Sequence, residues 1–442
     1  MNQPSRTSLH RITIVGGGAG GLELAVRLGN KLGKHGKAEI ILVDSARTHV
    51  WKPLLHQVAA GTLVGREDGT EYLALARRHH FHFRLGRMDG LNRSRKEIRL
   101  APIYDDQGEE VLPAQRIPYN TLVLALGSQT NDFGTPGVHE HSIMLDSPEA
   151  AERFHHRLVN ACLRAQARPR MPGGPCFTVA IIGGGPTGVE LSAELHRTAR
   201  ILSSYGAANF DPKKDIKIVL VEAAPRLLQA LPEKLSGAVE HELKDLDIEV
   251  IANARVVEID RKGVHLASGH FIPSNIVVWA AGIKIPDFLK DIDGLETNRI
   301  NQLVVARTMQ ATRDPDIFAI GDCAAIPHGE SETSVPPRAQ AAHQEAATLA
   351  KSLMCRLKGK PLIEFTYRDR GSLISIADYS AVGSLMGTIT RRSVFIEGKF
   401  AKWMYWSLHK QHQIVVNGLF RTWLGTWAEM IHSARNPGTK LH

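Results

Sequence analysis

Two glycine-rich turns, each lying between an apolar strand and a helix, constrain this chain more than any other feature. The first turn, in RITIVGGGAGGLELAVRLG, follows an apolar run that ends at Val15. The second, in FTVAIIGGGPTGVELSAEL, follows a run that ends at Ile182. A strand, a tight turn and a helix N-terminus present backbone N–H groups and a positive dipole end to a pyrophosphate. One such turn is also compatible with a purely structural loop, but two predict an α/β fold with two Rossmann-type dinucleotide-binding domains.

Each unit continues into a strand that ends on an acidic residue. AEIILVD ends at Asp44, close to the ~20 positions after the last glycine that are expected for the acid that binds a ribose. IKIVLVE ends at Glu222 after a longer gap, and we expect residues 204–214 to be the insertion responsible. A carboxylate accepts a 2′-hydroxyl and repels a 2′-phosphate, so the second site is predicted to prefer NADH to NADPH.

Two dinucleotide sites in one chain indicate that each site binds a different nucleotide. A tightly held FAD in the first site and a transient NADH in the second would let a hydride pass from NADH to the flavin. The apolar runs 119–128 and 275–283 end in small residues and predict strands that carry the chain between the two domains. DPDIFAIGDCA, residues 314–324, predicts a further strand with Gly321 and Asp322 at the head of a helix.

Charge and cysteine content exclude several classes of protein. The net charge of +9 and the pI of about 9.4 favour an acidic partner such as anionic lipid or nucleic acid, but no nucleic-acid recognition motif accompanies the charge. The four cysteines form no CxxC pair, which excludes a dithiol redox centre and a zinc ribbon. Histidine clusters at 77–83 and 409–412 lack co-ligands at a recognised spacing, so we expect no metal site. The residues before the first strand are neither a signal peptide nor a membrane span, and we expect a cytosolic protein.

The C-terminal region combines an apolar helical stripe with aromatic and basic residues. No apolar run of 18 residues occurs, so we expect neither a transmembrane helix nor proton pumping. Counted from Val416, one helical face would carry Leu419, Phe420, Trp423, Leu424, Trp427, Met430 and Ile431. Upstream, Trp403, Tyr405 and Trp406 add residues that favour the membrane interface. This pattern predicts a helix lying in the membrane surface; the alternative is a helix packed on the core or on a second subunit.

The paired glycine turns, AIGDCA and the region PPRAQAAHQ (336–344) resemble the type II NADH:quinone oxidoreductases, the single-subunit respiratory NADH dehydrogenases of bacteria. The similarity covers essentially the full chain and is greatest to proteobacterial members. It implies a non-proton-pumping enzyme with non-covalent FAD, NADH as co-substrate and ubiquinone or menaquinone as acceptor. It also implies a peripheral protein on the cytoplasmic face of the inner membrane, attached to its anionic surface, with a homodimer as a further possibility.

The resemblance also assigns residues. The family's AQxAxQ quinone signature covers residues 339–344, and Gln340 and Gln344, four apart on one helix face, are expected to bond quinone carbonyls. Glu190 matches a glutamate for which proton relay or charge balance is proposed; an acid near a helix N-terminus is also simply stabilising. Arg370 occupies a position where many members carry Lys, and a permanently charged guanidinium is the poorer proton donor.

Asp322 is expected to accept a hydroxyl in the ribityl and phosphate region of FAD, beside Gly321. Lys52 is either a neighbour of the isoalloxazine ring or a solvated lysine before a turn proline. The full set of cofactor-binding candidates is Gly16, Gly18, Ala19, Gly20, Gly21, Asp44, Lys52, Gly127, Gly183, Gly185, Thr187, Gly188, Glu222, Gly282, Gly321, Asp322 and Ala339.

The predicted organisation is an FAD domain split into residues 1–165 and 285–380, an inserted NADH domain at 166–284, and a membrane-association segment at 381–442. The Pro- and Gly-rich residues 166–176 are the expected crossing into the insert. Three alternatives use some of the same features. A soluble reductase of a ferredoxin would share both nucleotide sites, and a sulfide:quinone reductase would need a reactive cysteine set. An NADH-sensing binding protein would have no use for the flavin.

Overall fold

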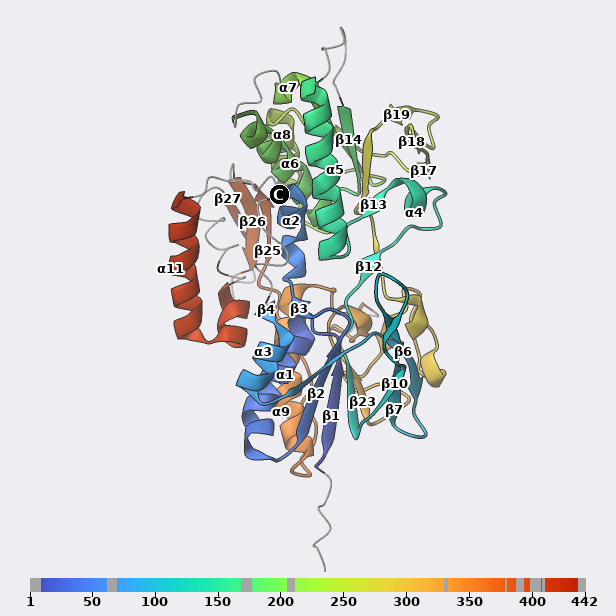
Figure 1. The fold of residues 1–442 in the computed structure, drawn as a ribbon, viewed down its shortest axis with the longest axis vertical. Helices are drawn as coiled ribbons and strands as arrows, with labels where there is room; N and C mark the ends of the chain where they lie inside the picture. Colours follow the sequence, from blue (N-terminus) through green and yellow to red (C-terminus); the bar gives the residue numbers. More distant parts are fainter. Residues whose placement is uncertain are drawn as a thin grey trace, which may run out of the picture.

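The computed structural model describes residues 9–61, 70–167, 177–204, 211–329, 333–377, 380–386, 393–397, 407 and 410–435. They form two stacked lobes, with the C-terminal elements on one side of the waist between them (Figure 1). Each lobe contains a five-stranded parallel sheet and a three-stranded antiparallel sheet. This is the α/β architecture that the two glycine turns predict.

The lower lobe is built on five parallel strands in the order β23-β11-β1-β2-β5. Its central strands are buried on both faces, as parallel strands covered by helices must be. The helix α1 follows the first glycine turn and packs against α9. The strands are β1 (Arg11–Val15), β2 (Glu39–Asp44), β5 (His82–Leu85), β11 (Thr121–Leu124) and β23 (Ile317–Ala319), and the helices are α1 (Ala19–Lys31), α3 (Tyr72–His79) and α9 (Ala339–Arg356).

The upper lobe repeats this plan with the strand order β13-β20-β14-β15-β16, all parallel. β14 leads into the second glycine turn and β15 leads to Glu222. In the lower lobe, β1 leads into the first glycine turn and β2 ends at Asp44. The strands are β13 (Ile143–Met144), β14 (Phe177–Ile182), β15 (Ile216–Val221), β16 (Glu249–Ile251) and β20 (Ile276–Trp279). The helices are α2 (Leu55–Ala60), α4 (Val138–His141), α5 (Pro148–Ala167), α6 (Pro186–Ser204), α7 (Pro212–Asp215) and α8 (Glu233–Asp245).

Short antiparallel strands complete the two lobes. One three-stranded sheet is β10-β7-β6 and the other is β17-β18-β19. Their bounds are β6 (Met88–Asn92), β7 (Glu97–Leu100), β10 (Gln115–Pro118), β17 (Val256–Ile259), β18 (Gly263–Leu266) and β19 (Phe271–Pro273). Two-stranded pairs are formed by β3 (Thr48–His49) with β4 (Thr70–Glu71), β8 (Ile103–Tyr104) with β9 (Glu110–Leu112), and β22 (Leu303–Val304) with β24 (Ala324–Ala325).

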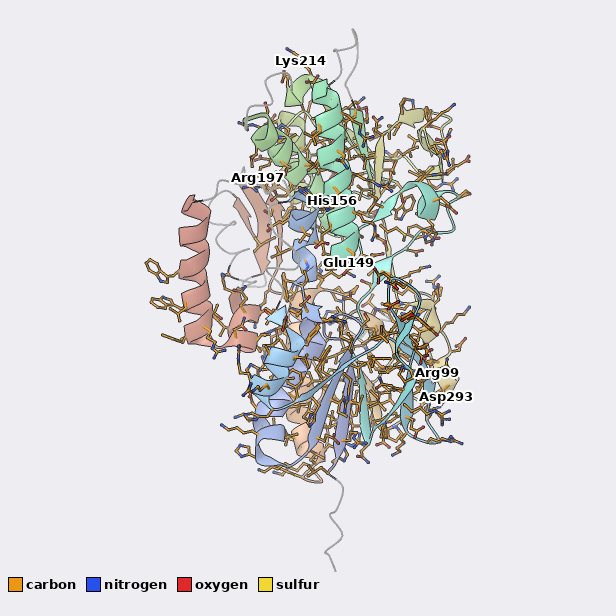
Figure 2. All side chains as sticks on the ribbon, viewed as in Figure 1. Arg99, Glu149, His156, Arg197, Lys214 and Asp293 are labelled. Carbon is orange, nitrogen blue, oxygen red and sulfur yellow. The ribbon has the colours of Figure 1, made fainter. Side chains whose placement is uncertain are left out.

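The chain crosses between the lobes through a two-stranded antiparallel pair, β12 (Gln129–Thr130) with β21 (Ile283–Lys284). β13 already pairs with β20 of the upper sheet, and α5 contributes to the upper core. Glu149, near the start of α5, lies close to the waist in Figure 2. We therefore propose that the insert begins just after residue 130, rather than at 166, and ends near 284 as predicted. Residues 168–176, most of the expected crossing, lie outside the described part of the chain.

The C-terminal region corrects one detail of the predicted stripe. Residues 410–417 are helical and α11 (Leu419–Arg435) is a separate helix, because Gly418 adopts a left-handed φ of +82° between them. Val416 is 2% exposed and belongs to the lower core, whereas Leu419 is 73% exposed. The prediction of one unbroken face starting at Val416 is therefore wrong. The side chains of Met430 and Ile431, and residues 403–406, lie outside the described set.

Against the upper lobe, β25 (Ser372–Ile376), β26 (Ser380–Met386) and β27 (Ser393–Glu397) form an antiparallel sheet, in which β25 contacts α6. α11 stands beside this sheet at the edge of the molecule (Figure 1). No helix among the described residues is long and apolar enough to cross a membrane.

Candidate functional site

The first glycine turn has the tight backbone that its sequence predicts. Gly16 has a φ of +104°, and a Cβ placed there would lie 2.4 Å from the Ala125 carbonyl oxygen. A Cβ on Gly21 would lie 1.9 Å from the Gly16 oxygen, so the turn, α1 and β11 are in close contact. Gly18, in contrast, faces open space, and no side chain caps the start of α1 at Ala19. The uncapped N–H groups and the open glycine fit a pyrophosphate.

The second turn repeats this geometry. Gly183 has a φ of +114°, and a Cβ on Gly188 would lie 2.0 Å from its carbonyl oxygen. Gly185 faces open space, as Gly18 does, and Thr187 lies in the first turn of α6. A cavity of about 1140 Å³ opens in front of this turn. Among the predicted residues, its lining includes Gly183, Gly185, Glu222, Gly282, Ala339, Gln340 and Arg370.

The two acids at the strand ends hold matching positions. Asp44 accepts hydrogen bonds from the backbone N–H groups of Gly17 at 2.6 Å and Ala46 at 2.7 Å. Glu222 accepts the equivalent bonds from Gly184 at 2.6 Å and Ala224 at 2.7 Å. Burial raises the pKa of Asp44, although these N–H bonds oppose the rise. Each carboxylate is thus fixed beside its glycine turn, where a ribose hydroxyl can reach it.

Ser128 joins three of the predicted FAD-binding residues. Only its place after a strand could have pointed to it in the sequence. Its backbone N–H and its hydroxyl donate to Asp322 Oδ2 at 3.0 and 2.7 Å, and its carbonyl accepts from Lys52 Nζ. A Cβ on Gly127 would lie 4.0 Å from the same Nζ. β1, β11 and β23 are adjacent and parallel, so their carboxyl ends bring these loops together, which is where open α/β sheets bind ligands.

Glu345 supports the neighbouring Gly321 from inside the protein. The Gly321 N–H donates to Glu345 Oε2 at 2.5 Å, and Gly321 has a φ of +71°. Burial raises the pKa of Glu345 to about 8; the bond from Gly321 opposes the rise, and the charge of Asp322 adds to it. Glu345 is therefore an acid that is largely protonated at neutral pH, directly behind the Asp322 loop.

The signature glutamines both bind the backbone of residues 368–371, the segment that runs over the start of α9. Gln340 Nε2 donates to the Gly371 carbonyl at 3.0 Å and to Asp369 Oδ1 at 3.2 Å, and its Oε1 accepts from the Arg370 N–H at 3.2 Å. Gln344 accepts from the Arg368 N–H at 3.1 Å and donates to the Arg368 carbonyl at 2.9 Å. Gln340 has thus used both amide protons, whereas Gln344 keeps one that could serve a ligand.

A second cavity, of about 140 Å³, lies against these glutamines. Its wall is formed by α1, α9, residues 51–54, the segment 368–371 and the helical residues 410–417. The lining is Glu23, Trp51, Pro53, Leu54, Ala339, Gln340, His343, Gln344, Arg370, Gln411 and His412. Glu23, His343 and His412 were not predicted as site residues, because they meet only through contacts between distant segments.

Glu190 lies in a separate buried environment between α2, α6 and β25. Its Oε1 accepts from the Ser375 N–H at 3.1 Å, and its Oε2 lies 3.4 Å from His56 Nδ1. Burial lowers the pKa of His56 to about 4, so this imidazole is neutral at physiological pH and the contact is not an ion pair. Arg370 is placed by Gln340 and lines both cavities instead.

The remaining negative predictions concern metals and thiols. Among the described residues, no group of three or more His, Cys, Asp or Glu side chains is arranged to hold a metal ion. Cys162 and Cys323 are buried and free, and burial raises the pKa of each thiol to about 12. Thiols held in this way are inert at neutral pH. Cys176 lies outside the described part of the chain.

Two glycine turns, two fixed acids and a cavity running from one nucleotide site towards the other define a flavoprotein oxidoreductase with two dinucleotide-binding domains. A family model described as pyridine nucleotide-disulphide oxidoreductase matches residues 10–346. The type II NADH:quinone oxidoreductase of Haemophilus influenzae is 42% identical over 98% of this chain and 100% of its own length. That of Mycobacterium tuberculosis is 28% identical over 85% of this chain and 79% of its own. The chain belongs to the type II NADH:quinone oxidoreductases, as the sequence predicts.

Solved structures agree on the fold. The structure of NDH2 from Plasmodium falciparum in complex with NADH matches with a TM-score of 0.79 at 18% identity, over 98% of this chain and 99% of that chain. A sulfide:quinone oxidoreductase from Aquifex aeolicus matches with a TM-score of 0.71 at 20% identity, over 92% of each chain. The fold is thus shared with one of the alternatives, and the sequence relatives decide between them.

Proposed function

We propose that the first glycine turn holds FAD and the second holds NADH, in an enzyme that transfers electrons from NADH to a membrane quinone. The chain is a flavoprotein of the non-proton-pumping NADH:quinone oxidoreductase family. Gly16, Gly18 and the uncapped N-terminus of α1 would hold the FAD pyrophosphate, and Asp44 the ribose. Lys52, Gly127 and Asp322, brought together by Ser128, would hold the flavin and its ribityl chain. When bound, FAD accepts a hydride from NADH and passes the electrons on.

One observation carries this assignment: the large cavity is continuous from the second glycine turn to the start of α9. Glu222 lies at one end of it, and Ala339, Gln340 and Arg370 at the other. A nicotinamide bound along this cavity would therefore reach the region that the signature residues share with the smaller cavity. We assign the smaller cavity to the quinone head group, with Gln344 as the donor to one carbonyl and Gln340 as the residue that fixes the segment over it.

We also propose that α11 attaches the enzyme to an anionic membrane surface from the cytoplasmic side. Its large apolar side chains point outwards, with Leu419, Phe420, Trp423, Leu424 and Trp427 between 46% and 73% exposed. The polar Thr422 faces inwards and is 8% exposed. In Figure 2 most of the side chains that are drawn on α11 project away from the body of the molecule. A helix packed on its own core would have the opposite orientation. The adjacent quinone cavity would then open near the lipid that dissolves its substrate.

The test of the function is a comparison of acceptors. The protein purified with its flavin should reduce a ubiquinone analogue with NADH and should show no ferredoxin reduction. Rapid NADH-dependent reduction of ferredoxin without quinone reduction would favour the soluble reductase. The quinone reductase and the soluble ferredoxin reductase share the nucleotide sites, so only the preferred electron acceptor distinguishes them.

A further inference from the structure

Three histidines and one glutamate form a buried group behind the smaller cavity. The carboxylate of Glu23, on α1, is 1% exposed. His343 Nδ1 lies 2.9 Å from its Oε1 and 2.8 Å from its Oε2, and His412 Nδ1 lies 2.9 Å from Oε1. His412 Nε2 lies 3.0 Å from His49 Nε2, and His49 Nδ1 lies 3.0 Å from the Gly17 carbonyl oxygen. The group connects the first glycine turn, α1, α9 and the C-terminal helical residues.

Glu23 accepts hydrogen bonds from two of these histidines. Although burial opposes it, the bonds from His343 and His412 hold the pKa of Glu23 at about 2, so this carboxylate only accepts. A carbonyl oxygen also only accepts, so Nδ1 of His412 and Nδ1 of His49 each carry a proton. The two Nε2 atoms lie 3.0 Å apart, within hydrogen-bond distance, and link the two rings.

His343 is the member of the group that can reach a substrate. It lies inside the quinone signature, at a position that the signature leaves open, and its side chain is 27% exposed while that of His412 is 4% exposed. Glu23 holds Nδ1, so Nε2 is the nitrogen left to the cavity, and it makes no hydrogen bond to the described residues. A carboxylate that fixes one ring nitrogen and leaves the other towards the reacting group is the arrangement of a general acid–base histidine.

Other charges face this histidine from each neighbouring element. Arg27 Nη2, on α1, lies 3.5 Å from Glu23 Oε2. Arg370 lines the same cavity from the segment over α9, and the His49–His412 pair approaches from the far side of Glu23. Arg27 and Arg370 thus place permanent positive charge near Glu23 and His343.

We propose that His343 is the general acid that protonates the quinone, and that Glu23 is the positioning residue that holds its ring. The inference rests on the proposed quinone site. NADH supplies two electrons and one proton as a hydride, and quinol formation needs one further proton from solution. In the proposed step the Nε2–H bond of protonated His343 breaks as the quinol O–H bond forms, and the electron pair stays on Nε2. His343 then regains a proton from water at its exposed edge.

The experiment separates quinone reduction from NADH oxidation. Stopped-flow measurements follow flavin reduction by NADH, and then its reoxidation by a ubiquinone analogue, in the parent, His343→Gln and Glu23→Gln. We expect His343→Gln to slow reoxidation about 100-fold, to leave reduction by NADH unchanged, and to be partly rescued by added imidazole. In Glu23→Gln the amide oxygen still accepts from Nδ1–H, but the alkaline limb of the pH profile should move to lower pH because the imidazolium loses its counter-charge.

His270→Gln, an exposed histidine of the upper lobe, is the matched control and should behave as the parent. Unchanged reoxidation in His343→Gln, or a change confined to the KM for quinone with no rescue by imidazole, would overturn the proposal. A parent that reduces no quinone at all would instead overturn the proposed function. Circular dichroism of each variant distinguishes a local effect from misfolding.

Discussion

The outward face of α11 gives a prediction whose size follows from the structure. Trp423 and Trp427 are 55% and 50% exposed. A tryptophan offers about 150–250 Å² of surface, so roughly 100 Å² of each side chain is open to water. At about 25 cal/mol per Å², full burial of both would contribute about 5 kcal/mol. An interfacial helix buries only part of each ring, so we expect about 3 kcal/mol for the pair, a loss of about 100-fold in binding when both become Ala.

The assay is co-sedimentation of Trp423→Ala/Trp427→Ala with vesicles that contain anionic lipid. Tyr104→Ala is the matched control, because Tyr104 is an aromatic residue of similar exposure, at 57%, and lies on β8, far from α11 in the sequence. NADH oxidation with a soluble dye should be unchanged in all proteins. Equal vesicle binding by the double variant and the parent would refute the membrane assignment. A change of oligomeric state in place of vesicle binding would assign α11 to a second copy of the chain.

Three further predictions concern the nucleotide and quinone sites. Glu345, with its pKa raised from 4.5 to about 8, favours folding fully below pH 4.5 and progressively loses this contribution as the pH rises through 8. In the parent, the free energy of unfolding should therefore fall by up to about 5 kcal/mol between pH 4.5 and 8 because of Glu345, and in Glu345→Gln this fall should be absent. Urea unfolding across that pH range measures the difference. Glu222→Gln should reduce the preference for NADH over NADPH about tenfold in kcat/KM, since a neutral amide no longer repels a 2′-phosphate; an unchanged ratio would contradict the role of Glu222. Gln344→Leu should raise the KM for quinone about tenfold at unchanged NADH-to-dye activity, because one hydrogen bond is lost. An unchanged KM would place the quinone elsewhere.

The parts of this protein that local sequence determines were predictable. A glycine turn needs only a strand before it and a helix after it, so Gly16, Gly21, Gly183 and Gly188 could be placed from their neighbours. The α9 signature lies on one helix face for the same reason. β20 was also predictable, because each of its residues, Ile276–Trp279, is apolar.

The remaining features depend on contacts between distant segments. Ser128 meets Asp322, and Glu23 meets His412, only because parallel strands and packed helices bring their loops together. The periodicity of residues 416–427 could not reveal that Gly418 divides two helices with opposite environments. Residues 166–176 look like a linker in composition, whereas the pairing of β12 with β21 supports the crossing that we propose there. Local composition indicates whether a segment is flexible or polar, but strand pairing depends on residues distant in the sequence.

The central claim is that one chain couples oxidation of NADH to reduction of a quinone. The most direct measurement follows both compounds in the same anaerobic sample of purified flavoprotein with a ubiquinone analogue. We predict that NADH disappears and quinol appears at equal rates, and that NADPH supports only a small fraction of this rate. Consumption of NADH without formation of quinol, or equal rates with both nucleotides, would contradict the account.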